Sequence, residues 1–289
     1  MRVAVVIVNF HAGEVLAETV RRAMLQPEVA ELVVVDNGSA PGEVEAALAG
    51  HDPRRVRRLD LPENPGFAVA CNRGVKLTES PWILFLNPDC WLPEHCLGAL
   101  AKVAMPQSVL AVLGAALIDR DGHLDPASMR RDPSPLRAIA TATGLDRYAW
   151  RWPWLQGIAL PMGDNEAPRR VDAISGALML VRREAFHAVG GFDEGYFMHA
   201  EDLDLCRRVR GLGFEVWCAP AVRVLHLKGV SSRRRRFRVA YAKHRSMLRY
   251  FEKFDALALA WPWRVLIRMG AWSRLLIELG RAAWPPRPA

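Results

Sequence analysis

The stretch Val-Ala-Val-Val-Ile-Val, residues 3–8, is a continuous apolar run rich in β-branched side chains. Such a run predicts a strand that is buried on both faces, as in a parallel sheet covered by helices. A second run of this kind covers 31–35, and the residues between them, 13–25, carry apolar side chains at helical spacing. The chain therefore begins with a strand–helix–strand unit.

The alternation continues along the chain. Further strands are expected at 56–61, 82–86, 109–117 and 173–181, with one or two more within 214–225. Helices are expected at 67–77, 93–103, 201–212, 232–254 and 257–283, and Gly213 is placed to end the third of these. Residues 120–170 have weak periodicity and are expected to form a loop-rich insertion. The pattern predicts an α/β fold with a mostly parallel central sheet flanked by helices.

The bulk composition bounds the class of protein. The chain has 289 residues, of which 51% are hydrophobic and 24% charged, so it can build one large α/β domain or two small ones. Its five cysteines show no paired or zinc-like spacing, which favours reduced thiols in the cytoplasm. The first residues are expected to form a strand and not a signal peptide. The sequence contains no run of about 18 uncharged apolar residues, so no membrane-spanning helix is expected.

The net charge of +8 is concentrated near the C-terminal end. Residues 231–238 read Ser-Ser-Arg-Arg-Arg-Arg-Phe-Arg, and residues 257–279 mix three tryptophans with three arginines. This mixture is typical of a helix that lies on an anionic membrane surface. Nucleic-acid binding, or a solvated basic face beside ordinary core tryptophans, would produce the same composition.

Polar side chains stand at the ends of successive predicted strands. They are Asn9, Asp36 and Asn37, Asn64, and Asp89. Because ligands of open α/β sheets bind beyond the carboxyl ends of the strands, this pattern indicates a ligand with many hydroxyl and amide groups. The alternative is that these side chains only cap the turns after the strands.

The segment 63–74, Glu-Asn-Pro-Gly-Phe-Ala-Val-Ala-Cys-Asn-Arg-Gly, contains neither a P-loop nor a dinucleotide-binding glycine pattern. Gly66 would let a ligand or another backbone approach the start of a helix. Arg73 could face a phosphate or could lie on a solvated helix surface.

Two residues are candidate metal ligands. Asp89 follows the strand at 82–86 in the turn Asn87-Pro88-Asp89, where a carboxylate suits Mg²⁺ or Mn²⁺. His226 follows a predicted strand, and an imidazole suits Mn²⁺ better than Mg²⁺.

Residues 192–206, Phe-Asp-Glu-Gly-Tyr-Phe-Met-His-Ala-Glu-Asp-Leu-Asp-Leu-Cys, concentrate five carboxylates among apolar side chains. Glu201, Asp202 and Asp204 begin a predicted amphipathic helix, so they are expected at a helix N-terminus beside a cleft, where the pKa of a carboxyl can be tuned. An acidic first turn that only favours the helix dipole is the alternative.

Taken together, these pieces resemble an inverting family 2 glycosyltransferase of the GT-A fold, in its rhamnosyltransferase-like branch. The matching stretches keep the order of the family and span residues 3–229. They are Val-Ile-Val-Asn-Phe (6–10), Val-Val-Asp-Asn-Gly-Ser (34–39), Glu-Asn-Pro-Gly-Phe (63–67) with Asn72 and Gly74, Leu-Asn-Pro-Asp (86–89), Ser-Gly-Ala (175–177), Gly-Gly-Phe-Asp-Glu (190–194), Phe-Met-His-Ala-Glu-Asp-Leu-Asp-Leu-Cys-Arg-Arg (197–208) and His226.

The resemblance implies roles for individual residues. Asp202 matches the catalytic base, and Glu201 beside it is expected to be the second catalytic residue. Asp89 stands where the metal-binding DXD motif of the family ends, and His226 would complete a site for Mg²⁺ or Mn²⁺. The residues expected at the donor are Asn9, Asp36, Asn37, Asn64, Gly66, Asn72, Arg73, Asn87, Ser175 and Gly176.

The resemblance also implies an activity. The protein would move a sugar, such as rhamnose or another deoxysugar, from a dTDP- or UDP-sugar to a lipid-linked or cell-surface glycan. Asn87 replaces the first Asp of DXD, which would lower metal affinity, and the QxxRW motif of processive synthases is absent after the base, which favours single additions.

Residues 1–230 are therefore expected to form the catalytic domain, with 120–170 as its insertion, and 231–289 a basic, Trp-rich helical extension. The enzyme is expected in the cytoplasm, with peripheral contact to the inner face of the membrane and no nucleic-acid partner. A sugar nucleotidyltransferase is the alternative, but it would need a basic glycine-rich loop near the N-terminus, and residues 9–14 contain Gly13 and no Lys.

Overall fold

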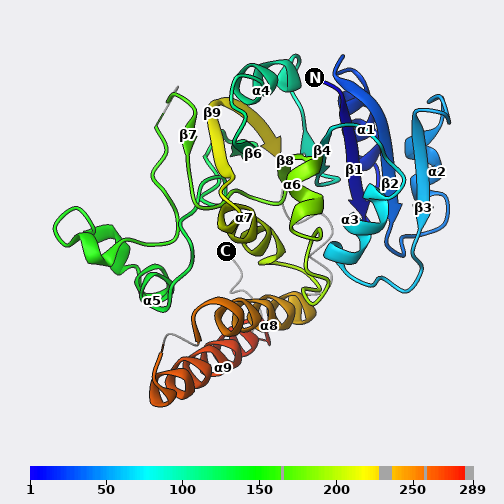
Figure 1. The fold of residues 1–289 in the computed structure, drawn as a ribbon. Coiled ribbons are helices and arrows are strands. Elements are labelled where there is room, and N and C mark those ends of the chain that lie inside the picture. The colour runs from blue at the N-terminus through cyan, green and yellow to red at the C-terminus, as the bar shows by residue number, and fades with distance from the viewer. Residues whose placement is uncertain (164–165, 228–235, 257–258, 284–289) are drawn as a thin grey trace.

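The computed structural model describes residues 1–163, 166–227, 236–256 and 259–283. A twisted central sheet has helices on both faces, and two long helices lie together below it (Figure 1). The strands are β1 (Val3–Asn9), β2 (Val29–Asp36), β3 (Val56–Asp60), β4 (Trp82–Leu86), β5 (Cys90–Trp91), β6 (Leu110–Ile118), β7 (Arg169–Arg170), β8 (Leu178–Arg182) and β9 (Glu215–His226).

The helices alternate with these strands, as the sequence predicts. The α-helices are α1 (Val15–Met24), α2 (Glu43–Leu48), α3 (Phe67–Val75), α4 (Cys96–Ala104), α5 (Pro135–Thr143), α6 (Arg183–Ala188), α7 (Glu201–Gly211), α8 (Arg236–Phe254) and α9 (Trp261–Ala283). Gly213 has a φ of 86° directly after α7, so the predicted glycine stop of this helix is confirmed.

The strand order is β3-β2-β1-β4-β8-β6-β9-β5, with β7 beside β9. Strands β1 to β4 pair in parallel, and β6 pairs in parallel with β9. Strand β8 runs antiparallel between β4 and β6. The predicted α/β class with a mostly parallel sheet is confirmed, and the antiparallel β8 is an addition that residue patterns do not reveal.

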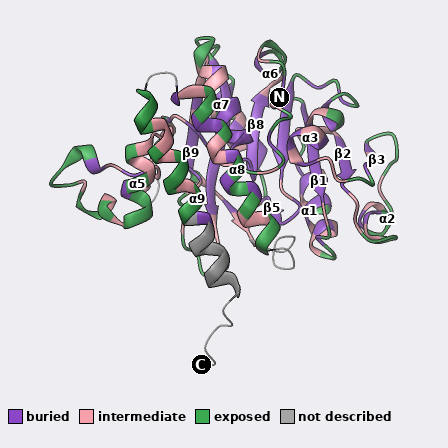
Figure 2. Cartoon of the chain, turned by 90° about the horizontal axis from the view of Figure 1, so that it is seen from below, coloured by how far each residue is buried: buried purple, intermediate pink, exposed green. Residues whose placement is uncertain are grey.

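The continuous apolar runs are explained by burial on both faces of the sheet. Every residue of β1 is buried. Val3, Val5 and Ile7 pack on one side with α1 and α4, whereas Val6 and Val8 pack on the other side with α3, α6 and α7. Figure 2 shows that central strands such as β1 and β8 are largely buried and that exposed residues gather on the outer helices and loops.

The insertion at 120–170 is loop-rich, but it is more ordered than its sequence indicates. It contains α5 and two short 3₁₀ helices (Leu145–Tyr148 and Pro153–Leu155), and it ends in β7. Helix α5 begins at the cap Ser134, whose Oγ accepts a hydrogen bond from the backbone N–H of Arg137, with Pro135 at the first helical position.

The two predicted C-terminal helices correspond to α8 and α9. Residues 231–235 of the predicted basic run at 231–238 lie outside the described residues. Residues 257–258, the first two of the predicted helix at 257–283, also lie outside them. No helix in the described ranges is both long enough and apolar enough to span a bilayer.

Candidate functional site

The polar residues at the ends of β1 and β2 are brought together by the parallel register of these strands. Asn9 pairs with Asp36, and the backbone N–H of Asn37 donates to the carbonyl of Asn9 at 2.8 Å. The Asn9 side-chain N–H donates to Ser39 Oγ at 2.9 Å and to Glu43 Oε1 at 2.8 Å. Ser39 and Glu43 were not among the predicted site residues, because their link to Asn9 is a tertiary contact.

Asp36 is a buried carboxylate held on both oxygens. Its Oδ1 accepts from the backbone N–H of Ser39 at 2.9 Å, and its Oδ2 lies 3.2 Å from Arg58 Nη2. Arg58, on β3, was missed by the sequence analysis, since one arginine on a strand carries no local signal.

Asn37 and Asn64 face each other, and the Asn37 side-chain N–H donates to Asn64 Oδ1 at 2.9 Å. Asn64 lies in the loop between β3 and α3, and its backbone has a left-handed φ of 47°. The Oδ1 atoms of Asn9 and Asn37 are buried and accept no hydrogen bond from a described residue. Buried acceptors without partners are costly, so these two oxygen atoms are suited to a ligand that donates hydrogen bonds.

Gly66 lies against the segment that leads into α7. Its φ is 104°, and a Cβ there would stand 2.6 Å from the carbonyl oxygen of Phe197. The backbone N–H of Phe67 donates to that same oxygen at 2.8 Å. The close approach expected at Gly66 is therefore made by another backbone, and it joins the loop after β3 to the segment before α7.

Asn72 and Arg73 lie on α3. Both polar atoms of the Asn72 amide bond to the loop before α7, through the backbone of Phe192 and the Glu194 carboxylate. Arg73 is exposed on the surface of α3. In this structure Asn72 positions the loop that carries the acidic motif.

The predicted metal ligands meet although 137 residues separate them. Strand β5 pairs antiparallel with the end of β9, so that Cys90 stands opposite His226. Asp89 Oδ1 lies 3.4 Å from His226 Nε2, and both side chains are largely buried. Cys90 Sγ also lies within 4.8 Å of the ligand atoms of Asp89 and His226. Burial raises the pKa of Cys90 well above its usual range, so its thiol stays neutral and is a weak ligand.

Asp125 is a further acid beside this cluster that the sequence analysis missed. Its Oδ2 lies 3.8 Å from His226 Nδ1. Burial opposes protonation of His226, but the carboxylates of Asp125 and Asp89 outweigh it and raise its pKa to about 9. A buried site with this excess of negative charge and with oxygen and imidazole donors fits a divalent cation such as Mn²⁺.

Helix α7 presents its acids at a tightly shaped N-terminus. His199 and Ala200 both have a φ of 65°, so the chain turns sharply just before the helix begins at Glu201. Glu201, Asp202 and Asp204 are all buried in the first turn. The helix dipole stabilises anions at this end, which lowers the cost of burying them.

Asp202 is held in one position by three donors. Its Oδ2 accepts from the backbone N–H of Gly176 at 2.9 Å and from Arg130 Nη2 at 2.5 Å. Its Oδ1 accepts from the backbone N–H of Leu203 at 2.8 Å. Burial raises the pKa of Asp202, but Arg130 and the two N–H groups outweigh burial and hold it below its usual value.

Arg130 was missed by the sequence analysis, because it lies in the insertion that has no clear periodicity. Its guanidinium also donates to the carbonyl of Ile174, so it bridges the insertion, the segment before β8 and α7. Its link to Asp202 crosses 72 residues of sequence, and no local pattern predicts it.

The pKa of Glu201 is shifted in the direction opposite to that of Asp202. Burial, followed by the Asp202 carboxylate, raises the pKa of Glu201 to about 8. Its Oε2 is buried and has no hydrogen-bond partner among the described residues. The pair is therefore expected to carry one negative charge near neutral pH, located on Asp202.

Gly176, Ser175 and Asn87 lie where β4 and β8 meet. Gly176 faces Asp202 so closely that a Cβ would stand 3.2 Å from the Asp202 Cβ. The backbone N–H of Asn87 donates to the carbonyl of Ala177 at 2.9 Å, and Ser175 Oγ accepts from the N–H of Ala177. This contact places the turn that carries Asp89 next to the segment that holds Asp202.

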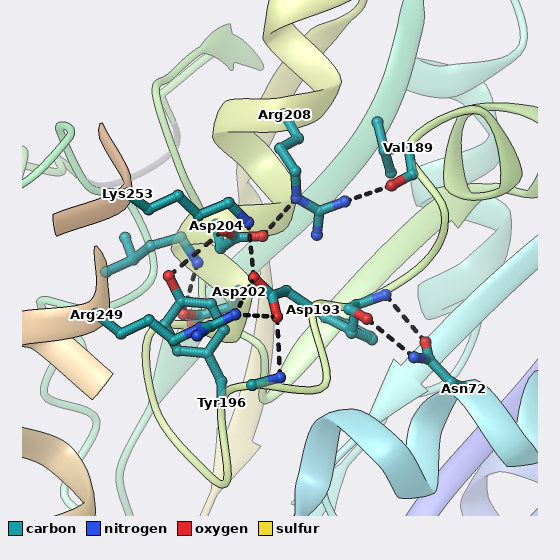
Figure 3. A network of polar contacts seen from close by, with 12 residues as sticks. Asn72, Val189, Asp193, Tyr196, Asp202, Asp204, Arg208, Arg249 and Lys253 are labelled. Carbon is teal, nitrogen blue, oxygen red and sulfur yellow. Dashed lines mark hydrogen bonds and ion pairs between the residues drawn. The ribbon is translucent and has the colours of Figure 1, made fainter. Parts of the chain in front are cut away.

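Asp204, the third acid, belongs to a structural network (Figure 3). It is fully buried and accepts from Lys253 Nζ at 2.6 Å and from Arg208 Nε at 2.5 Å. Lys253 and Arg249 both bond Asp193 in the loop before α7. Asp204 therefore fixes α7 to α8, and its carboxylate is not free for chemistry.

Comparison with known proteins decides the family. The profile described as "Glycosyl transferase family 2" matches residues 4–190. The chain belongs to glycosyltransferase family 2. It is thus a glycosyltransferase, and the resemblance found in the sequence is confirmed, whereas the nucleotidyltransferase and nucleic-acid-binding alternatives are not supported.

Two curated relatives are named for rhamnose transfer. This glycosyltransferase is 34% identical over 215 residues to N-acetylglucosaminyl-diphospho-decaprenol L-rhamnosyltransferase of Mycobacterium tuberculosis. The match covers 70% of this chain and 68% of the relative. It is 39% identical over 149 residues to rhamnosyltransferase WbbL of Escherichia coli, which covers 51% of this chain and 53% of that protein.

A solved structure confirms the GT-A fold. The mannosyltransferase PcManGT from Pyrobaculum calidifontis, solved with GDP-Man and Mn²⁺, superposes with a TM-score of 0.58 at 16% sequence identity. The superposition covers 99% of this glycosyltransferase and 76% of the other chain.

Glu201→Gln is expected to stabilise the glycosyltransferase at pH 9 and to have little effect at pH 5. In the unfolded chain this carboxyl titrates near 4.5, and in the folded chain at about 8. Ionisation of Glu201 therefore costs the folded state up to about 1.4 kcal/mol per pH unit between these values, and neutral Gln avoids that loss.

Urea unfolding of both proteins across this pH range measures the effect. Glu184→Gln, at an exposed position on α6, is the matched control and should show no such pH-dependent difference. A gain from Glu201→Gln that is equal at pH 5 and pH 9 would contradict the raised pKa.

Proposed function

We propose that this glycosyltransferase moves rhamnose or a related deoxysugar from a pyrimidine nucleoside diphosphate to a lipid-linked saccharide, with inversion at the anomeric carbon. The observation that carries the proposal is Asp202, a buried carboxylate held anionic and immobile by Arg130 and the N–H groups of Gly176 and Leu203. A carboxylate that is ionised at neutral pH and held in one orientation can accept the proton of an attacking hydroxyl.

The donor would occupy the edge of the sheet where β1, β2 and β3 end. Asp36 would offer acceptors to the N–H of a pyrimidine ring and to ribose hydroxyls, as would the Oδ1 atoms of Asn9 and Asn37, which accept no hydrogen bond within the described part of the chain. Asn64 is held beside these acceptors by its hydrogen bond with Asn37. A uracil or thymine ring has such an N–H, which supports a UDP- or dTDP-sugar.

The diphosphate of the donor would extend toward Asn87 and Asp89. Asp89 and His226 would hold Mg²⁺ or Mn²⁺, and that ion would supply positive charge to the departing diphosphate. Ser175 and Gly176 lie between this turn and Asp202, at the place where the sugar would sit.

In the transfer step, Asp202 would accept the proton of the acceptor hydroxyl as that oxygen forms a bond to the anomeric carbon. Arg130 keeps the carboxylate ionised and oriented, so no base needs to be generated at neutral pH. Attack from the side opposite the diphosphate would invert the anomeric configuration. Glu201, neutral near pH 7, would leave the local charge on Asp202.

The acceptor class is supported by the relatives. The M. tuberculosis relative is named for a saccharide joined by a diphosphate to decaprenol. Helix α9 exposes Trp261 by 73% and Trp263 by 60%, and basic side chains are interspersed with the aromatic ones. We propose that α9 rests on the inner face of the cytoplasmic membrane, where a lipid-linked acceptor would be found.

Asp202→Asn is expected to reduce transfer by about 10²- to 10⁴-fold, because it keeps the shape of the side chain and removes the proton acceptor. Binding of the donor should remain. Transfer rates and a thermal-shift panel of dTDP- and UDP-sugars with Mn²⁺ measure the two effects, since a ligand that binds the folded state raises the melting temperature.

Glu184→Gln, which makes the same kind of change at an exposed position on α6, is the control for this variant and should retain transfer. Near-normal turnover in Asp202→Asn would remove Asp202 as the base. No thermal shift of the unaltered protein with any sugar nucleotide would overturn the proposed donor class.

Asp89→Ala is expected to abolish the Mn²⁺-dependent part of the donor thermal shift, with at least about a tenfold loss of apparent Mn²⁺ affinity. Asp119→Ala is the control, because Asp119 lies with Asp121 and His123 in a separate, more exposed cluster. An unchanged Mn²⁺ dependence in Asp89→Ala would exclude Asp89 from the metal site.

Replacing both Trp261 and Met269 by Ser should weaken binding to vesicles rich in anionic phospholipid by at least about tenfold, because these two exposed side chains lie toward one side of α9 and would enter the lipid interface together. Vesicle co-sedimentation measures this. Trp154→Ser, which removes an exposed tryptophan of the insertion, should leave vesicle binding unchanged. Equal losses in both variants would contradict contact through α9.

A further inference from the structure

A cavity of about 710 Å³ lies between the loop after β3, the loop before α7 and the first half of α8. Pro65 contributes from the first loop, and Glu194, Gly195 and Phe197 from the second. In Figure 1, α8 lies below the sheet and the loop before α7 reaches down to it. None of the residues assigned above to the base or the metal lines this cavity.

One part of the wall is aromatic and accessible to solvent. Phe197 is 41% exposed, Phe237 51% and Tyr241 46%. These three large aromatic side chains give the cavity an apolar surface, and exposure of that surface to water is unfavourable in free energy. The cavity is therefore suited to a ligand with a hydrocarbon part.

The other part of the wall is cationic. Arg238 and Arg245 line the cavity from α8, and neither forms an ion pair with a residue of the described ranges. They are seven residues apart, which places them two turns apart on one face of the helix with Tyr241 between them. Two guanidinium groups that have no acidic partner within the described ranges, on either side of an aromatic ring, are suited to a phosphate or diphosphate.

Among the described lining residues, the one acid, Glu194, forms no ion pair with Arg238 or Arg245, and its single negative charge is outnumbered by the two arginines. Glu194 Oε1 accepts from the side-chain N–H of Asn72 at 3.0 Å, on α3. The hollow thus keeps an excess of positive charge beside its aromatic wall.

The cavity borders the segment that leads to the proposed base. Ser246 Oγ, in the cavity wall, donates to the carbonyl of Met198 at 2.8 Å. Burial and the ammonium group of Lys243, on α8, lower the pKa of the next residue, His199, while Asp202 raises it. The charges of Lys243 on α8 and of Asp202 on α7 therefore both act on His199. Since the cavity wall contacts Met198, four residues before Asp202, a saccharide attached to a group in the cavity would lie near Asp202.

We propose that this cavity binds the diphosphate and the first isoprenoid units of a polyprenyl diphosphate-linked acceptor. Arg238 and Arg245 bind the diphosphate, and Phe197, Phe237 and Tyr241 contact the hydrocarbon chain. This assignment rests on the proposed function, and it adds where the acceptor lipid binds. The donor requires none of these residues, because its proposed pocket is formed by β1, β2 and β3.

Farnesyl diphosphate is the probe, because it combines a diphosphate with a short isoprenoid chain. Its affinity for the full chain is measured by isothermal titration calorimetry in the absence of vesicles. Arg238→Ala and Arg245→Ala should each weaken binding about tenfold or more, since each removes a charge-assisted hydrogen bond. Arg54→Ala removes an exposed arginine outside the cavity and should leave the affinity unchanged.

Two further ligands test the two halves of the site. Inorganic pyrophosphate and farnesol should each bind at least tenfold more weakly than farnesyl diphosphate. Pyrophosphate that binds as tightly as farnesyl diphosphate would overturn the isoprenoid contact. An affinity for farnesyl diphosphate that neither arginine variant changes would overturn the cavity assignment.

The sugar-nucleotide thermal shift separates this inference from the proposed function. A normal donor shift without farnesyl diphosphate binding overturns the cavity assignment and leaves the donor proposal standing. Farnesyl diphosphate binding that depends on the arginines, without any donor shift, supports the cavity and overturns the donor assignment. Both arginine variants should keep the donor shift of the unaltered protein.

Discussion

The buried ion pair between Arg130 and Asp202 joins the parts of the chain on which the site depends. It connects the insertion, the segment before β8 and the N-terminus of α7. A carboxylate buried alone would take up a proton, and a guanidinium buried alone would be strongly destabilising. Each group is therefore retained in its charged form by the other, and the fold keeps the charged Asp202 carboxylate away from bulk water.

A second set of charges attaches the C-terminal helices to that same region. Lys253 and Arg249 on α8 bond Asp193, and Lys253 also bonds the fully buried Asp204 on α7 (Figure 3). Arg207, also on α7, bonds Asp255 just after α8. The helix that forms the wall of the aromatic, cationic cavity is thus held rigidly to the helix that carries Asp202. A lipid contact made by α8 or α9 would be positioned with respect to the base.

Most of the elements that form the sheet could be predicted from the sequence, because strands buried on both faces leave continuous apolar runs. Strand β1 and helix α7 match their predictions closely. Helices α2 and α6 have only six residues each, which is too short for a helical period to emerge. Helix α5 was missed because it lies among the prolines and tryptophans of an irregular segment.

The sequence by itself determined the family, the fold class and the identity of the acids, since ordered motifs and apolar periodicity are local properties. The tertiary structure decided which acid bears the charge. Asp202 meets Arg130 and Gly176, Asp204 meets Lys253, and Glu201 meets no cation at hydrogen-bonding distance among the described residues. These partners lie tens of residues away in sequence, and a pKa depends on what surrounds a carboxyl in space.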